Sequence, residues 1–323
     1  MNRRLLGRTG WAVSEVGFGA WAIGGNRYGN SYGPTDDAES IRAVRRAVDL
    51  GCTCFDTADV YGHGHSEALL GKALADRRGD VILITKVGGN FYNRDLHPLL
   101  QDRVAQAAGV PYSQIPADAP LPVTHDATFS PDYIRFALGR SLARLQTGYV
   151  DLLLLHNPPL AQIADLATYG VLEDLKREGK IRAYGVSVHS PEEGMAAIQS
   201  TMPDVVELVY NLARREAESA FFPAARAADI GVIAREPLAN GFLAGRYTRE
   251  STWDAGDIRA RMPQHYVAQM AQLGHRVREL SQRARCSAAQ LALKFVLDNS
   301  AVSTVIVGTK TVAQANENFD VET

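Results

Sequence analysis

The stretch Asp37–Asp56, DAESIRAVRRAVDLGCTCFD, contains a helix pattern followed at once by a strand pattern. Residues Asp37–Leu50 repeat their apolar side chains with a helical period, and Gly51 supplies a C-terminal stop. Residues Thr53–Asp56 then form a short apolar run that predicts a buried strand. A helix that leads directly into such a strand is the repeating unit of a parallel α/β sheet.

The same unit recurs along the chain. We expect eight strands, at Val16–Gly19, Thr53–Asp56, Ile82–Lys86, Leu152–His156, Ala183–Val188, Val205–Val209, Val232–Arg235 and Val305–Val307. Eight alternations without a change of composition predict a single domain over residues 1–323, an α/β fold of the closed (β/α)8 TIM barrel type. An open dinucleotide-binding sheet would carry G-x-G-x-x-G after its first strand, where this chain has only Gly24-Gly25.

Several segments lie outside the regular alternation. Arg3–Leu6 and Ala12–Ser14 predict an N-terminal β-hairpin that caps the barrel floor. Residues 87–128 and Asn240–Pro263 follow strands and predict long loops on the C-terminal face, the first an extended active-site loop. Further helices are expected at Ser130–Leu145, Ala161–Glu178, Gln264–Ala284 and Ser287–Leu297.

Composition argues against several classes of partner. The 34 Lys and Arg residues against 36 Asp and Glu leave a charge of -2 without a basic face, so nucleic acid and membranes are poor partners. Apolar runs are too short to span a bilayer and the start lacks a signal-peptide core, so we expect a cytoplasmic monomer or homo-oligomer. Three cysteines form no disulfide framework, and His63-Gly64-His65 is too little for a metal site, so no metal is expected.

Four polar side chains follow candidate strands: Asp56, Tyr61, Lys86 and His156. The carboxyl ends of barrel strands meet at the face where barrel enzymes hold their active sites. A lysine that closes an apolar strand needs a carboxylate partner, which Asp56 can supply. Lys86 could then stabilise the phenolate of Tyr61, and a neutral His156 could polarise a carbonyl oxygen. Together they describe proton delivery to an alkoxide, hence carbonyl reduction.

Each of these residues also has a plain structural explanation. Asp56 can cap a helix, Tyr61 can be a surface aromatic, Lys86 can extend its amine to solvent, and His156 can be a core residue. Their joint occurrence at successive strand ends favours a site, although position alone does not name the reaction.

The segment Gly51–Gly71, GCTCFDTADVYGHGHSEALLG, resembles the signature of the aldo-keto reductase superfamily. Further matches are Ile84-Thr85-Lys86, Ser141–His156, Gly179–Arg182, Gly185–Ser187, Tyr210–Leu212 and Pro237–Gly245. The resemblance implies an NADPH-dependent oxidoreductase, with NAD(H) as the alternative cofactor, acting on a small-molecule carbonyl or alcohol such as an aldehyde, ketone or keto-sugar. It makes Tyr61 the general acid or base, tuned by Lys86 and Asp56, with His156 orienting the carbonyl.

The same resemblance implies cofactor contacts at Trp21, Ser187, Glu207, Arg235, Pro237, Leu238, Gly241, Leu243, Gly245, Gly308, Thr309, Lys310, Gln314 and Asn318. Ser187 and Glu207 would lie near the nicotinamide amide, and Lys310 would face the 2′-phosphate. Val188 and Arg235 depart from the family pattern, where Asn and an aromatic residue are common, and Glu207 stands where Gln is frequent.

The substrate pocket and two other functions remain open. Trp21, Tyr28 with the region that follows it to Tyr32, Phe91 and Tyr92 are expected to line an aromatic pocket, although packing of the long loop on the barrel rim explains them equally well. One alternative is a cofactor-binding regulatory subunit resembling potassium-channel β subunits. Another is a lyase or isomerase that uses Lys86 as a Schiff-base amine.

Overall fold

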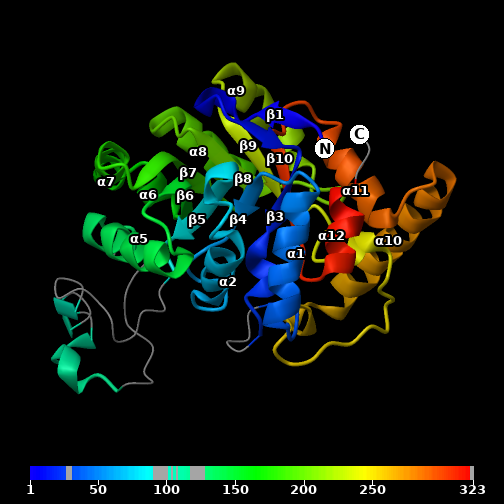
Figure 1. Ribbon diagram of the computed structural model, residues 1–323, viewed down its shortest axis with the longest axis horizontal. Helices are drawn as coiled ribbons and strands as arrows, with labels where there is room; N and C mark the ends of the chain where they lie inside the picture. Colours follow the sequence, from blue (N-terminus) through cyan, green and yellow to red (C-terminus); the bar gives the residue numbers. More distant parts are fainter. Residues whose placement is uncertain (27–30, 90–100, 103–104, 107, 117–127, 321–323) are drawn as a thin grey trace.

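The computed structural model describes residues 1–26, 31–89, 101–102, 105–106, 108–116 and 128–320. Within them, eight parallel strands close into a barrel in the order β10-β3-β4-β5-β6-β7-β8-β9 (Figure 1). The strands are β3 (Val16–Gly19), β4 (Cys54–Asp56), β5 (Ile82–Val87), β6 (Val150–His156), β7 (Ile181–Ser187), β8 (Val205–Val209), β9 (Gly231–Arg235) and β10 (Thr304–Gly308). The predicted (β/α)8 barrel is confirmed, and the predicted strand ends differ from these by at most one or two residues.

An N-terminal hairpin closes one end of the barrel, as predicted. It pairs β1 (Arg3–Leu5) with β2 (Ala12–Ser14) in antiparallel register. Leu6 and Val13 are buried among apolar side chains from inside the barrel, including Cys54 and Ile84. The barrel interior is therefore sealed at its floor, and its opening lies at the opposite face.

Helices surround the strands (Figure 1). They are α1 (Asp37–Asp49), α2 (His65–Leu74), α5 (Pro131–Leu145), α6 (Leu160–Ile163), α7 (Leu166–Arg177), α8 (Pro191–Ser200), α9 (Phe221–Ala227), α10 (Gln264–Ala284), α11 (Ala288–Leu297) and α12 (Val312–Phe319). Short 3-10 turns are η1 (Gly7–Thr9), η2 (Ala20–Ile23), η3 (Arg78–Asp80), η4 (Tyr112–Gln114), η5 (Glu216–Glu218), η6 (Phe242–Ala244) and η7 (Ile258–Arg261). Among the described residues, no helix combines the length and the hydropathy that crossing a bilayer requires.

The prediction of one helix over Ala161–Glu178 was wrong, because this segment forms α6 and α7. Asp165 lies between them in an extended conformation, and its carboxylate accepts hydrogen bonds from the backbone amides of Ala167 and Thr168. This N-cap satisfies amides that would otherwise be unpaired, and it starts a new helix where the periodicity suggested a continuous one.

Candidate active site

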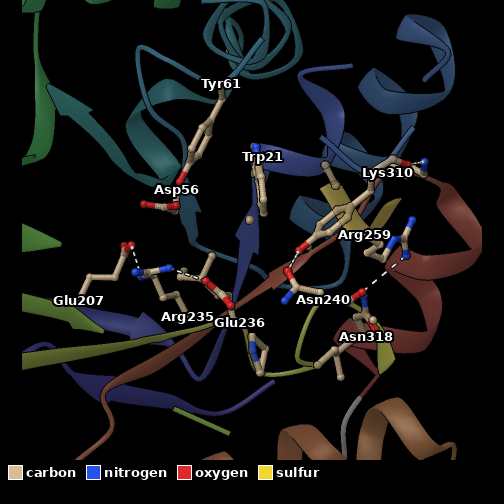
Figure 2. Close-up of a pocket in the computed structure, with 18 of the residues that line it drawn as sticks. Trp21, Asp56, Tyr61, Glu207, Arg235, Glu236, Asn240, Arg259, Lys310 and Asn318 are labelled. Atoms are coloured by element: carbon tan, nitrogen blue, oxygen red, sulfur yellow. Dashed lines mark hydrogen bonds and ion pairs between the residues drawn. The ribbon is translucent and has the colours of Figure 1, made fainter. Parts of the chain in front are cut away.

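A cavity of about 970 Å³ opens at the carboxyl ends of the barrel strands. Asp56 and Arg235 reach it from the ends of β4 and β9, Glu207 reaches it from within β8, and Tyr61 and His156 also line it. Figure 2 shows the Tyr61 hydroxyl directed toward Asp56, while Lys310 and Asn318 lie toward the other end of the pocket. Side chains from distant parts of the sequence therefore share one elongated space.

Lys86 is the centre of the polar cluster at one end of the cavity. Its side chain is fully buried, and its Nζ donates to both carboxylate oxygens of Asp56 at 2.6 Å. The same atom donates to the backbone oxygen of Thr57 at 3.1 Å and to the Tyr61 hydroxyl at 3.3 Å. His156 completes the group, with its ring 5.7 Å from that of Tyr61 in an edge-on arrangement. The structure thus brings the four predicted residues together.

The charges of this cluster depend on one another. Burial by itself would lower the pKa of Lys86, but the carboxylates of Asp56 and Glu207 outweigh burial and raise it. Burial and the negative charge of Glu207 raise the pKa of Asp56, and Lys86 opposes this rise. Lys86 therefore remains an ammonium ion at neutral pH, as expected for a buried cation with close carboxylate partners.

Tyr61 and His156 hold the two remaining titratable positions. Burial raises the pKa of Tyr61 to about 12, although Lys86 acts to lower it. Lys86 thus favours the phenolate, but the cost of desolvating the phenolate is larger. Burial, followed by the charges of Lys86 and Arg235, lowers the pKa of His156 well below its usual value, so its imidazole is neutral. The cavity presents a protonated phenol beside a neutral imidazole.

The turn that carries Tyr61 is held in place by contacts of its neighbours Gly62 and Glu67. Gly62 has a φ of +58°, and a β-carbon there would lie 2.1 Å from the backbone oxygen of Gly24. Glu67, at the start of α2, is fully buried and accepts a hydrogen bond of 2.6 Å from Thr85 on β5 and one of 2.7 Å from Arg144 on α5. These contacts tie the turn to the barrel wall and restrict where the phenol can lie.

A second chain of charges runs across the cavity floor from Lys86. Glu207 Oε1 lies 3.6 Å from Lys86 Nζ and accepts a 2.8 Å hydrogen bond from Ser187. Arg235 approaches the same oxygen to 4.0 Å and donates to Glu236 at 2.5 Å (Figure 2). Among the described residues, the buried Glu207 Oε2 and the Oδ1 of Asn157 have no hydrogen-bond partner. Two residues that line the cavity thus each carry a buried acceptor without a partner.

Ten of the residues expected to contact a cofactor line the cavity: Trp21, Glu207, Arg235, Pro237, Leu238, Gly241, Gly308, Lys310, Gln314 and Asn318. The other four are not among the lining residues. Ser187 is bonded to Glu207, Leu243 is fully buried in the apolar core, and Gly245 packs against α10. The hydroxyl of Thr309 accepts a hydrogen bond of 3.0 Å from Asn318.

Of the four residues expected to line the substrate pocket, the structure describes one. Trp21 lines the cavity, and its ring lies 6.1 Å from that of Tyr61. Tyr28, Phe91 and Tyr92 lie outside the described residues. Of the predicted 87–128 loop, the described residues Gly88, Gly89 and Thr128 line the cavity.

Asn240, Tyr247 and Arg259 line the cavity beside Tyr32 and were not predicted from the sequence. Tyr32 donates a 2.7 Å hydrogen bond to Asn240, and the Arg259 guanidinium lies 4.9 Å from the Tyr32 ring and 5.0 Å from the Tyr247 ring. Arg259 is also paired with Asp257 at 2.6 Å. The only sequence signal for this group was the irregular Asn240–Pro263 segment, because nothing in its pattern indicates which residues face inward.

Titratable side chains that converge at the carboxyl face of a (β/α)8 barrel are typical of barrel enzymes, and this chain has such a site. The sequence model of the Aldo/keto reductase family matches residues 15–323, and the chain therefore belongs to this family of nicotinamide-dependent oxidoreductases.

Individual relatives agree with this assignment. The aldo-keto reductase YhdN of Bacillus subtilis is 32% identical, with 97% of this chain and 86% of the relative covered. An NADH-specific methylglyoxal reductase of Escherichia coli is 29% identical, covering 98% of this chain and 92% of the relative. The solved structure of a glycerol dehydrogenase from Gluconobacter oxydans superimposes with a TM-score of 0.76 at 26% identity, covering 100% and 90% of the two chains.

Proposed function

We propose that the chain reduces small aldehydes, ketones or keto-sugars, or oxidises the corresponding alcohols, with NADPH or its oxidised form as cofactor and Tyr61 as the proton-transferring group. The observation that carries this proposal is the Tyr61 hydroxyl, 3.3 Å from the Lys86 ammonium and in the same cavity as a neutral His156. A buried phenol beside a fixed cation is suited to give a proton where an alkoxide forms.

The residues present fit a nicotinamide cofactor. The unpartnered acceptors Glu207 Oε2 and Asn157 Oδ1 suit the NH2 group of its carboxamide. At the other end, Lys310 gives two of its three ammonium hydrogens to the backbone oxygens of Tyr32 and Pro34, at 2.9 and 3.3 Å. The third hydrogen remains for an oxygen of the 2′-phosphate, which favours NADPH over NADH. When bound here, the reduced nicotinamide supplies the hydride.

The chain's own side chains would then manage the proton. Tyr61 donates its hydroxyl proton to the substrate oxygen, and Lys86 stabilises the phenolate that remains. The neutral ring of His156 can hydrogen-bond the same oxygen and fix its direction without placing a second positive charge beside Lys86. Asp56 holds the ammonium in place with two 2.6 Å hydrogen bonds.

The Schiff-base alternative receives no support from this geometry. A Schiff base requires a neutral amine, but Lys86 is buried among two carboxylates that raise its pKa. Borohydride treatment in the presence of substrate is therefore expected to leave Lys86 unmodified.

The substrate class is inferred from the residues that line the cavity and from the relatives. Trp21, Val60 and His189 line the cavity and combine apolar surface with a polar side chain. The relatives include a methylglyoxal reductase and a glycerol dehydrogenase, so small oxygen-rich carbonyl compounds are the first candidates.

The test is NADPH oxidation with methylglyoxal, glyceraldehyde, dihydroxyacetone and a set of keto-sugars. Tyr61→Phe is the matched variant because it removes one oxygen, and we expect it to bind NADPH normally but to lose turnover by about 10²-fold or more. Parallel assays with NADH measure the cofactor preference. Turnover that survives in Tyr61→Phe, or the absence of NADPH binding in the wild-type chain, would contradict the proposal.

A further inference from the structure

Glu207 brings a second carboxylate to the cation that serves Tyr61. Its side chain is buried with 1% exposure, and its Oε1 lies 3.6 Å from Lys86 Nζ. Asp56 holds the same ammonium at 2.6 Å, and the Tyr61 hydroxyl meets it at 3.3 Å. One buried cation therefore faces two carboxylates and the phenol together.

The other charged and titratable groups around Tyr61 do not cancel the negative charge of Glu207. The groups that face Tyr61 are Asp56 from β4, Lys86 from β5, His156 from β6, Glu207 from β8, Arg235 from β9 and the Tyr32 phenol. His156 and Tyr32 are neutral, since burial lowers the pKa of the first and raises that of the second. Arg235 is 4.0 Å from Glu207, but it is bonded more closely, at 2.5 Å, to Glu236.

We propose that Glu207 is a positioning residue that draws part of the Lys86 charge away from Tyr61, and so sets the pH range over which Tyr61 gives and takes its proton. The inference rests on the proposed function, in which Tyr61 exchanges a proton with the substrate. A phenolate beside two buried carboxylates is less stable than one beside a single carboxylate. The charge of Glu207 acts to raise the pKa of Tyr61, so Tyr61 keeps its proton to higher pH and remains a proton donor there.

Glu207→Gln is the informative variant because it removes the charge and keeps an oxygen that can accept from Ser187. Alcohol oxidation needs the Tyr61 phenolate, whose fraction rises tenfold per pH unit below its pKa. Loss of a neighbouring negative charge should lower the pKa of Tyr61 by on the order of one unit. At saturating cofactor, kcat/KM for the alcohol should then rise about tenfold at each pH below that value, and carbonyl reduction should begin to decline at a lower pH.

Two further variants separate charge from structure. Glu207→Asp keeps the charge and should leave the pH profile close to that of the wild type. Glu216→Gln makes the same chemical change at an exposed carboxylate paired with Arg214 and should not move the profile. An unmoved profile in Glu207→Gln, an equal loss in both reaction directions, or the same displacement in Glu207→Asp would overturn the proposal.

A second measurement does not need turnover. Ultraviolet difference titration of the cofactor-free protein, with Tyr61→Phe as the reference, isolates ionisation of the Tyr61 phenol. Its onset should move to lower pH in Glu207→Gln, and an unchanged onset would overturn the inference. If neither the wild type nor Glu207→Gln binds nicotinamide or turns over substrate, the proposed function fails. This titration still decides whether Glu207 acts on Tyr61.

Discussion

Replacing Lys86 by Met should destabilise the chain by about 3–5 kcal/mol, which is the usual effect of removing one partner from a buried ion pair. Met fills much of the same space but removes the ammonium that gives Asp56 two hydrogen bonds of 2.6 Å. It also leaves Glu207 without the cation 3.6 Å away. Because both carboxylates are buried, water cannot replace the lost partner. A loss of this size is a large part of the 5–15 kcal/mol that ordinarily stabilises a folded protein.

The assay is equilibrium unfolding in urea at neutral pH, with the free energy of unfolding compared across a double-mutant cycle. Asp56→Asn combined with Lys86→Met should be more stable than Lys86→Met alone, because the buried charge that lacked a partner is gone. Both variants should be inactive, so the double variant should regain stability without regaining activity. The control is Lys72→Met, at an exposed position in α2, which should change stability by no more than about 0.5 kcal/mol.

The pH dependence gives an independent check of the cause. In Lys86→Met the Asp56 carboxyl has lost its cation, so its folded pKa rises further above the unfolded value of about 3.9. A carboxyl with a raised folded pKa favours the folded state at low pH and loses that contribution as the pH rises. The difference in stability from the wild type should therefore be largest near neutral pH and shrink toward about pH 4. The reasoning would be refuted if Lys86→Met had the same free energy of unfolding as the wild type at neutral pH. It would also be refuted if the double variant were less stable than Lys86→Met.

Three further outcomes follow from the site. Burial lowers the pKa of His156 well below its usual value, so its ring signals in nuclear magnetic resonance should not titrate between about pH 5 and 8; a midpoint near 6.5 would contradict this. Gly62→Ala should lose more than about 1–2 kcal/mol of unfolding free energy, since φ is +58° and the Gly24 oxygen blocks the β-carbon, whereas Gly79→Ala, with open space, should not. Lys310→Met should raise KM for NADPH about tenfold and leave KM for NADH nearly unchanged, and equal effects on both would remove Lys310 from the 2′-phosphate.

The barrel and the polar cluster were predictable because local patterns encode them. The strands are short apolar runs between helix stops and caps, and Asp56, Lys86 and His156 interrupt those runs at or near the strand ends. In a closed parallel barrel all such ends meet at one face, so topology alone brings the residues together. Only the strand limits and the break at Asp165 needed the structure.

Other parts of the site depend on contacts that no local pattern records. Lys310 donates to the backbone oxygen of Tyr32, 278 positions away, and Arg259 meets Tyr32 from a segment without helical or strand periodicity. The balance at Tyr61 was equally inaccessible. Its sign depends on whether desolvation exceeds the attraction of Lys86, and both quantities are set by the depth of burial.

Strand register finally determines whether the polar cluster exists at all. His156 pairs with Ser187, and Ser187 pairs with Glu207, which places the three residues in one row across β6, β7 and β8. A slip of one residue would turn these side chains toward the helices instead of the cavity. A buried ion pair contributes little net stability, so charges such as Lys86 and Glu207 cannot by themselves hold this register. The apolar residues packed inside the barrel and between strands and helices must hold it, and the reactive cluster draws on the stability they provide.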